Sequence, residues 1–330
     1  MTGLNTGPAS ARERAVTYVD VAPDQAGQRV DNFLMARLRG LPRTRVYRLL
    51  RRGEVRVNGG RIGPEHRLQA GDRVRLPPVD LPPPRAPAQA PDFRLRQLES
   101  AILFENDRLL VLDKPAGLAC HGGSGVDFGV IEALRQLRPK QPFFELVHRL
   151  DRDTSGCLLI AKRRSTLRAL HEQLRGGVIE KRYLALLVGP LAGRRQRVAA
   201  ALDRYERGGE RLVRVSDAGK PAVTVFHVRE RFANATLVEA ELLSGRTHQI
   251  RVHAQHLGHP LAGDPKYGDP TADAALRELG LRRLFLHAAR LVIGPLDDDT
   301  PRHFEAPLPA ALEQPLERLR SAHPPTARTA

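Results

Sequence analysis

Two carboxylates lie close together in a short charged run of the chain. The run is His148-Arg149-Leu150-Asp151-Arg152-Asp153-Thr154-Ser155-Gly156. It lies between the mostly apolar residues 144–147 and the apolar residues 157–161, so we expect a polar loop at the edge of a packed core, where catalytic groups are often held. Arginines flank both carboxylates, and a nearby guanidinium favours the ionised form of a carboxyl group. Asp151 or Asp153 could therefore act as a nucleophile or stabilise a developing cation.

The same residue types are compatible with a structural role. Asp151 could accept hydrogen bonds from the backbone amides of Thr154 and Ser155 and so cap a turn. Residue chemistry alone does not decide between the two roles.

The sequence around this run predicts a domain of strands and helices at about residues 93–320. Continuous apolar runs predict buried strands at 109–112, 157–161, 183–188, 235–243 and 284–293. Leucines at helical spacing after Ser165 predict a helix that stops at Gly176. A second helix is expected from Thr247 to Leu257. Long strands with occasional helices indicate an α+β domain around a mixed, largely antiparallel sheet.

The net charge of +16 is concentrated towards the start of the chain. Residues 29–75 hold thirteen arginines and four acidic residues, a net charge of +9. Such an excess is typical of proteins that bind polyanions. It favours a nucleic acid over an acidic membrane or a merely solubilising surface.

Two helices and several short strands are expected in this basic segment. Apolar residues on one face predict a helix at 29–38, and Thr44 can cap a second helix at 45–52. Short strands are expected at 54–57, 61–62 and 72–76. The second helix and the residue before its cap bring together the arginines that we expect to contact a polyanion, which are Arg43, Arg45, Arg48, Arg51 and Arg52.

Prolines separate this basic module from the larger domain. Residues 77–92 are proline-rich and predict an extended, semi-rigid linker. The basic module is therefore placed at 16–76. The two ends of the chain, 1–15 and 321–330, are expected to be disordered.

Neither a membrane span nor a metal site is expected. The chain has no run of about eighteen apolar residues and no apolar signal core at its start, which favours a cytoplasmic protein. Cys120 and Cys157 lack the spacing of metal ligands or of a disulfide framework. His248, His253 and His256 do not gather on one face of a helix.

Four ordered motifs in the large domain resemble the RluA-type pseudouridine synthases. They are residues 112–117 (LDKPAG) with 121–123 (HGG), residues 148–156, residues 181–185 (KRYLA) and residues 245–251 (GRTHQIR). The basic module resembles the S4 RNA-binding domain, a small fold also called αL, at residues 29–34, 53–59 and 70–72. Together these likenesses extend over about residues 17–320.

The resemblance implies that uridine in RNA is isomerised to pseudouridine. In this reaction the N1–C1′ bond breaks and a C5–C1′ bond forms, so no cofactor is implied, and the sequence has no P-loop or dinucleotide fingerprint. The resemblance implies Asp151 as the one catalytic carboxylate and Tyr183 as the aromatic residue at the base. It implies Arg246 as the partner that keeps Asp151 ionised, whereas Asp153 has no role in the motif.

Other residues of these motifs are expected to contact RNA. They are Lys114, His148, Arg149, Lys181 and Arg251, although Lys114 could equally solvate a turn, and Arg251 and His248 could have packing roles. A uridine stacked in RNA must be flipped out before its glycosidic bond can be reached. Basic contacts would offset that cost, and they would make the affinity fall with added salt.

The expected substrate is large-subunit (23S) ribosomal RNA, before or during its assembly. Residues 121–125 and 210–216 are most similar to family members that modify this RNA. A monomer is expected. Two other interpretations stay open, which are the same chemistry on transfer RNA or another RNA, and a non-catalytic RNA-binding factor of ribosome assembly. An acid on a basic face argues against the second, because binding alone does not require it.

Overall fold

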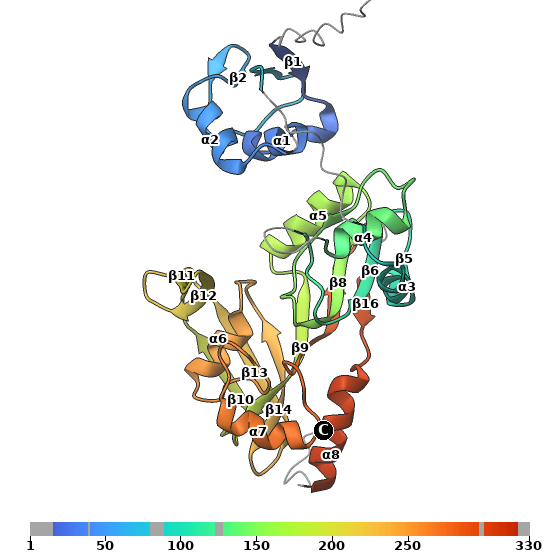
Figure 1. Ribbon diagram of the computed structural model, residues 1–330, viewed down its shortest axis with the longest axis vertical. Helices are drawn as coiled ribbons and strands as arrows, with labels where there is room; N and C mark the ends of the chain where they lie inside the picture. Colours follow the sequence, from blue (N-terminus) through green and yellow to red (C-terminus); the bar gives the residue numbers. More distant parts are fainter. Residues whose placement is uncertain (1–15, 39, 80–88, 123–127, 297–299, 323–330) are drawn as a thin grey trace, which may run out of the picture. The chain divides into compact units, whose positions relative to one another are not determined.

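The protein, described by a computed structural model, divides into two compact units, Met1–Pro87 and Ala88–Ala330. The structure describes residues 16–38, 40–79, 89–122, 128–296 and 300–322 (Figure 1). The expected disordered leader, 1–15, lies outside the described residues, as do 80–88 of the expected linker and 323–330 of the expected tail.

The first unit is a small antiparallel sheet with two helices. Its strands follow the order β1-β4-β2-β3 and are β1 (Thr17–Asp20), β2 (Arg56–Val57), β3 (Gly60–Arg61) and β4 (Arg73–Leu76). A short turn of helix η1 (Pro23–Gln25) and the helices α1 (Val30–Arg37) and α2 (Arg43–Arg51) complete the unit. Phe33 and Leu34 of α1 are buried with Val46 and Leu50 of α2 and with Val74 of β4.

The first unit differs from the expectation at two places. Helix α2 begins at Arg43 rather than at residue 45, because the carbonyl oxygen of Pro42 already accepts the N–H of Arg45 at 2.9 Å. Strand β1 was not predicted from the sequence, since its residues are largely exposed and it is defined by pairing with β4.

The second unit is built on one large sheet. Among the described residues, eight strands follow the order β10-β13-β14-β9-β15-β8-β6-β5, while β16 pairs with β15 and β7 pairs with β8. The pairings in this sheet are antiparallel except for that of β15 with β8. The expected α+β class, with a mixed and largely antiparallel sheet, is confirmed.

The remaining bounds are as follows. The strands of the sheet are β5 (Ile102–Glu105), β6 (Leu109–Lys114), β7 (Glu145–Leu146), β8 (Ser155–Ala161), β9 (Glu180–Val188), β10 (Arg195–Ala199), β13 (Val223–Arg231), β14 (Ala235–Leu242), β15 (Leu286–Ile293) and β16 (Arg302–Glu305). A separate hairpin consists of β11 (Leu202–Arg207) and β12 (Glu210–Val215). The helices are α3 (Asp92–Ser100), α4 (Val130–Leu137), α5 (Arg164–Arg175), α6 (Gln249–His256), α7 (Pro270–Glu278) and α8 (Ala310–Ala322).

Strand β8 is covered on both faces (Figure 1). Successive strand residues point to opposite faces, and here both sets are apolar. Leu158 and Ile160 belong to a core that includes Leu134 of α4, whereas Leu159 belongs to a second core that includes Leu170 of α5. Because helices close both faces, the polar residues 148–154 that precede β8 are held at its end by a rigid layer.

Gly156 lets two strands approach closely at the start of β8. Its φ is +108°, and a β carbon there would lie 2.3 Å from the carbonyl oxygen of Ala288 in β15. No other residue type fits this contact. The glycine therefore fixes the charged run directly against β15.

Lys114 does not reach RNA, contrary to the expectation. It is fully buried at the end of β6, and its Nζ donates hydrogen bonds to the carbonyl oxygens of Pro115 (2.9 Å), Leu118 (2.8 Å) and Arg152 (3.0 Å). Burial lowers the pKa of the lysine to about 8. The Gly117 N–H also donates to Arg152, at 2.8 Å. Lys114 is thus a structural residue that ties the turn after β6 to the charged run.

Three predicted boundaries in the second unit were wrong. Ala90, expected in the linker, is buried, and α3 begins at Asp92. Helix α8 continues to Ala322, where the tail was expected to have begun. Helix α6 begins at Gln249 instead of following a Thr247 cap. The reason in each case is tertiary packing that the local pattern does not encode.

We expect Lys114→Met to destabilise the second unit. The substitution keeps the length of the side chain but removes the donor of three carbonyl oxygens, one of them in a buried hydrogen bond. The loss of a hydrogen bond to a charged group costs about 1.5–3 kcal/mol. Calorimetry should show the melting temperature fall by about 5–10 °C. Lys140→Met, at an exposed lysine, is the matched control, and an equal melting temperature for both variants would contradict the assignment.

Candidate active site

The charged run lines a cavity of about 410 Å³. The other motif residues reach it from β9, from the turn before α6 and from the first turn of α6, while residues of α5, β11, β14 and β15 complete the lining. Seven of the residues expected at the site line this cavity together, namely His148, Arg149, Asp151, Lys181, Tyr183, Arg246 and Arg251. The volume is in the range typical of small-ligand sites. The five arginines expected on α2 belong to the other unit.

The carboxylate of Asp151 does not cap the turn of its own loop. The Thr154 N–H donates to the backbone carbonyl oxygen of Asp151 (3.2 Å), so the turn closes without the side chain. The side chain is 19% exposed, and its Oδ2 accepts a hydrogen bond from Nη1 of Arg251 at 3.4 Å. Nε2 of His248 lies 3.8 Å from the same oxygen. Among the described residues, Oδ1 has no hydrogen bond and is left for a substrate.

Arg251, and not Arg246, is the partner of Asp151. The expectation for Arg246 was wrong, since this residue is exposed and its Nε donates to the carbonyl oxygen of Pro221 at 3.2 Å. Helix α6 begins only at Gln249, so Arg251 lies in its first turn and points into the unit, whereas Arg246 lies in the turn outside. The side chain of Arg251 is 3% exposed.

Asp264 holds the guanidinium of Arg251 in place. Its Oδ2 accepts from Nε of Arg251 at 2.7 Å and its Oδ1 from Nη2 at 2.6 Å, a bidentate pair with the Asp264 side chain fully buried. Although burial opposes the charge of Arg251, the hydrogen bond and charge of Asp264, followed by those of Asp151, raise its pKa. The pair fixes Nη1 in the direction of Asp151.

Tyr183 projects from β9 into the same cavity and is 6% exposed. Burial, followed by the negative charge of Asp151, raises the pKa of the phenol, so the hydroxyl keeps its proton at neutral pH. Within the described part of the chain it has no hydrogen-bond partner. An aromatic ring with a free polar tip suits contact with a planar polar base.

The other expected residues that line this cavity are His148, Lys181 and Arg149. Nε2 of His148 accepts the N–H of Leu159 at 3.1 Å, and burial, together with the charge of Lys181, lowers the pKa of this histidine to about 4. His148 is therefore neutral and helps to anchor β8. Burial also lowers the pKa of Lys181. Arg149 is exposed at the rim.

The two carboxylates of the charged run face different surroundings. Asp153 lies 3.5 Å from Nε of Arg152, and it lines a separate cavity of about 510 Å³ together with Arg283. Asp151 and Asp153, although only two residues apart, therefore line different cavities.

Two contributing residues, Asp264 and Tyr267, were missed by the sequence analysis. Asp264 and Tyr267 come from the turn after α6, and Nδ1 of His248 lies 2.7 Å from the hydroxyl of Tyr267. The one local signal was an acid and an aromatic residue in the polar turn Gly263-Asp264-Pro265-Lys266-Tyr267-Gly268. His248 itself was noted but had no assigned partner.

His253, one of the three histidines considered above as metal ligands, is held by structural partners. Nδ1 of the buried His253 lies 2.9 Å from Oγ1 of Thr224, and its Nε2 lies 3.0 Å from the carbonyl oxygen of Ala200. In the described ranges, no group of three histidine, cysteine or acidic residues is placed to hold a metal ion. No helix in these ranges is long and apolar enough to cross a membrane.

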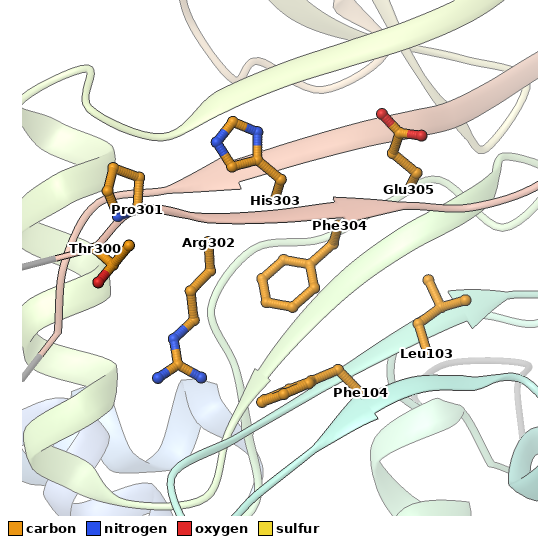
Figure 2. Close-up of a pocket in the computed structure, with 8 residues that line it drawn as sticks. All are labelled: Leu103, Phe104, Thr300, Pro301, Arg302, His303, Phe304 and Glu305. Carbon is orange, nitrogen blue, oxygen red and sulfur yellow. The ribbon is translucent and has the colours of Figure 1, made fainter. Parts of the chain in front are cut away.

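A larger hollow of about 600 Å³ lies between β5 and β16, and Figure 2 shows the eight residues that line it. The Phe104 and Phe304 rings lie 5.6 Å apart, and the guanidinium of Arg302 lies 5.6 Å from the Phe104 ring centre. None of the motif residues lines this hollow. It is a surface feature of the sheet and not the candidate site.

Two sequence profiles match this chain. The profile described as RNA pseudouridylate synthase matches residues 108–256, and the S4 domain profile matches residues 28–74.

Curated relatives are similar over nearly the whole chain. The ribosomal large subunit pseudouridine synthase C of Haemophilus influenzae is 52% identical over 311 residues, which cover 93% of this chain and 96% of the relative. The protein of the same name from Escherichia coli (strain K12) is 52% identical over 312 residues, which cover 93% of this chain and 98% of the relative.

Two solved human structures share the fold. RNA Pseudouridylate Synthase Domain Containing 4 has a TM-score of 0.58 and 27% identity and covers 69% of this chain and 96% of its own. RNA Pseudouridylate Synthase Domain Containing 1 has a TM-score of 0.56 and 28% identity, over 70% of this chain and 90% of its own. With its charged run, its cavity and these relatives taken together, the chain belongs to the pseudouridine synthase family and joins an RNA pseudouridylate synthase domain to an S4 domain.

Proposed function

We propose that this enzyme isomerises specific uridines of large-subunit (23S) ribosomal RNA to pseudouridine, with Asp151 as its catalytic carboxylate. The observation that carries the proposal is the cavity in which Asp151 lies 3.4 Å from Nη1 of the buried Arg251, with Tyr183 beside it. Relatives that share 52% of their residues with this chain are named for the large ribosomal subunit, which favours this RNA over transfer RNA.

The arrangement matches what the isomerisation needs. A carboxylate must act at C1′ of the ribose while the N1–C1′ bond breaks, either by attack or by stabilising positive charge on the sugar. Both roles need an ionised carboxyl group, and the Arg251 guanidinium stabilises this form. The uracil then turns, C5 bonds to C1′, and the proton on C5 leaves while N1 gains one, so the reaction balances without a cofactor or metal.

Tyr183 is proposed as the residue that faces the base. Its ring can stack on a uracil that has been flipped out of the RNA, and unstacking costs a few kcal/mol that such contacts offset. Lys181 and Arg149 at the cavity are proposed to contact the adjoining phosphates, because basic side chains pair with phosphate in nucleic-acid complexes.

The S4 unit is proposed to supply sequence-independent affinity for RNA. Val46, Leu49 and Leu50 bury one side of α2, and the arginines of the helix lie outside that side, of which Arg43, Arg48, Arg51 and Arg52 are exposed and Arg45 is half-buried. Guanidinium groups bind phosphates through charge and paired hydrogen bonds.

We further propose that the enzyme acts in the cytoplasm, as a monomer, before or during subunit assembly. Both cysteines are buried and unpaired, which suits a reducing compartment. A uridine is flipped out at lower cost when its RNA is not yet fully folded and packed.

Asp151→Asn should abolish the reaction. Release of tritium from [5-³H]uridine in 23S ribosomal RNA should fall by at least about a thousandfold, as when a nucleophile is removed, while binding of the RNA is retained. The control is Asp153→Asn, at the carboxylate outside the cavity, which should release tritium normally. Equal release by the two variants would refute the role of Asp151.

The unmodified enzyme tests the choice of substrate. If it releases tritium from transfer RNA but not from 23S RNA, the alternative substrate is supported. If it releases tritium from neither RNA, a non-catalytic binding factor is supported.

Arg251→Lys should distinguish the effect of the positive charge at this position from the effect of the paired contacts of the guanidinium. Lysine keeps the positive charge but cannot pair bidentately with Asp264 and reach Asp151 at once. We expect turnover to fall by about ten- to a hundredfold, with little change in the KM for RNA. Arg246→Lys should have a smaller effect, and the reverse order would restore Arg246 as the partner of Asp151.

Exchanging both Arg48 and Arg51 for alanine should weaken RNA binding in a salt-dependent way. The slope of log Kd against log salt should become less steep by about 1.4–1.8, because two phosphate contacts are lost. The matched control is the pair Arg94→Ala and Arg96→Ala on α3, which removes the same charge from the other unit. Equal slopes for the two double variants would argue against a specific role of α2.

A further inference from the structure

His248 occupies an unusual backbone position beside the proposed catalytic carboxylate. It lies just before α6 with φ at +54°, a left-handed conformation that is uncommon for residues with a β carbon and in which asparagine, aspartate and histidine are the most frequent of them. Its side chain is 13% exposed, and Nε2 lies 3.8 Å from Oδ2 of Asp151. The backbone therefore holds the imidazole next to Asp151 at some conformational cost.

A chain of hydrogen bonds determines which ring nitrogen of His248 carries the proton. The backbone N–H of Val213 donates to the hydroxyl oxygen of Tyr267 at 3.0 Å. The Tyr267 hydroxyl is then free to donate its own hydrogen, and Nδ1 of His248 lies 2.7 Å away. This arrangement favours Nδ1 as the acceptor and Nε2, which faces Asp151, as the nitrogen that carries the proton of the neutral ring.

Burial keeps the ring of His248 neutral among several charged and titratable groups. They come from the charged run, from α6, from the turn after it and from β12, and they are Asp151, Arg251, Asp264, Lys266, Tyr267 and Glu210. Burial is the largest cause that lowers the pKa of His248, while the charge of Asp151 opposes it. At neutral pH the imidazole therefore offers an N–H and no charge.

The hydrogen-bond chain begins in the hairpin of β11 and β12. Val213 lies in β12 and is buried with Leu202 of β11, Val252 of α6 and Tyr267, and Figure 1 shows the hairpin beside α6. Nη2 of Arg204 in the hairpin also donates to Oγ1 of Thr247 at 2.7 Å. The hairpin is thus fastened at two points to the segment that carries His248 and Arg251.

We propose that His248 is a positioning residue for Asp151, set in its Nε2-protonated form by the Tyr267 hydroxyl and hence by the docked hairpin. Together with Arg251 it directs Oδ2 of Asp151 inward, so that Oδ1 faces the ribose. The inference rests on the proposed role of Asp151.

Two substitutions, His248→Gln and His248→Asn, test the proposal. The side-chain amide of glutamine can place an N–H near the position of Nε2, whereas that of asparagine is too short to do so. Asparagine, however, fits the left-handed backbone better. The proposal predicts that His248→Gln keeps a higher turnover number than His248→Asn, although His248→Asn has the higher melting temperature. If the role of His248 were purely structural, the variant with the higher melting temperature would also have the higher turnover number. A higher turnover number for His248→Asn than for His248→Gln would therefore overturn the proposal.

Tyr267→Phe tests the tautomer. The variant removes only the hydroxyl, and a net hydrogen bond corresponds to about a fivefold preference between tautomers. With the two tautomers equally populated in the variant, the share that carries its proton on Nε2 falls from about five sixths to about one half. Turnover at pH 8 should therefore fall by about 1.7-fold, with an unchanged KM for RNA. As the pH is lowered towards 5.5, the defect should shrink in proportion to the fraction of rings that gain a proton, because a protonated ring carries a hydrogen on Nε2 whichever tautomer it came from. A defect of the same size at both pH values would contradict the inference.

Asp151→Asn, measured in the same assay, separates the two proposals. If this variant keeps full activity, the proposed function of Asp151 fails. If it is inactive while the His248 variants follow their stabilities and the Tyr267→Phe defect is independent of pH, only the positioning role fails.

Discussion

The site depends on one buried guanidinium that serves two carboxylates. Arg251 and Asp264 are both nearly inaccessible to solvent, and such a pair is favourable only when its remaining hydrogen-bonding groups are satisfied. Oδ1 of Asp264 meets this condition by also accepting the backbone N–H groups of Lys266 (2.9 Å) and Tyr267 (3.1 Å). One ion pair therefore joins α6 to the turn that follows it, and the remaining Nη1 is fixed towards Asp151.

The charged run is held just as firmly from the opposite side. Nη2 of Arg283 donates to the carbonyl oxygen of Asp153 (3.1 Å) and to Oγ of Ser155 (2.9 Å). Ser155 in turn lies 2.9 Å from Nδ1 of His287, whose Nε2 lies 3.1 Å from the carbonyl oxygen of Ala306. With Lys114 below and Gly156 against β15, the loop is in place before any RNA arrives, and such preorganisation is a main source of catalytic power.

The sequence predicted the parts of the site that depend on neighbouring residues. The loop before β8 and the strand position of Tyr183 follow from apolar runs that are long and continuous. The choice between Arg246 and Arg251 does not, because it depends on where α6 begins, and a shift of one residue turns a helical side chain by about 100°. The roles of Lys114 and Asp264 rest on contacts with partners from other parts of the fold, which no local pattern encodes.

Neutral side chains lie close to the charge pair of Asp151 and Arg251, while other basic residues, such as Arg149 and Lys181, also line the cavity. His148, His248 and Tyr183 are all buried enough that the shift in each pKa favours the uncharged form. Burial around Asp151 and Arg251 lowers the local dielectric, and the attraction between the two charges is then stronger than it would be in water. Among the described residues that line this cavity, Asp151 is the one carboxylate, since Asp153 lines a different cavity.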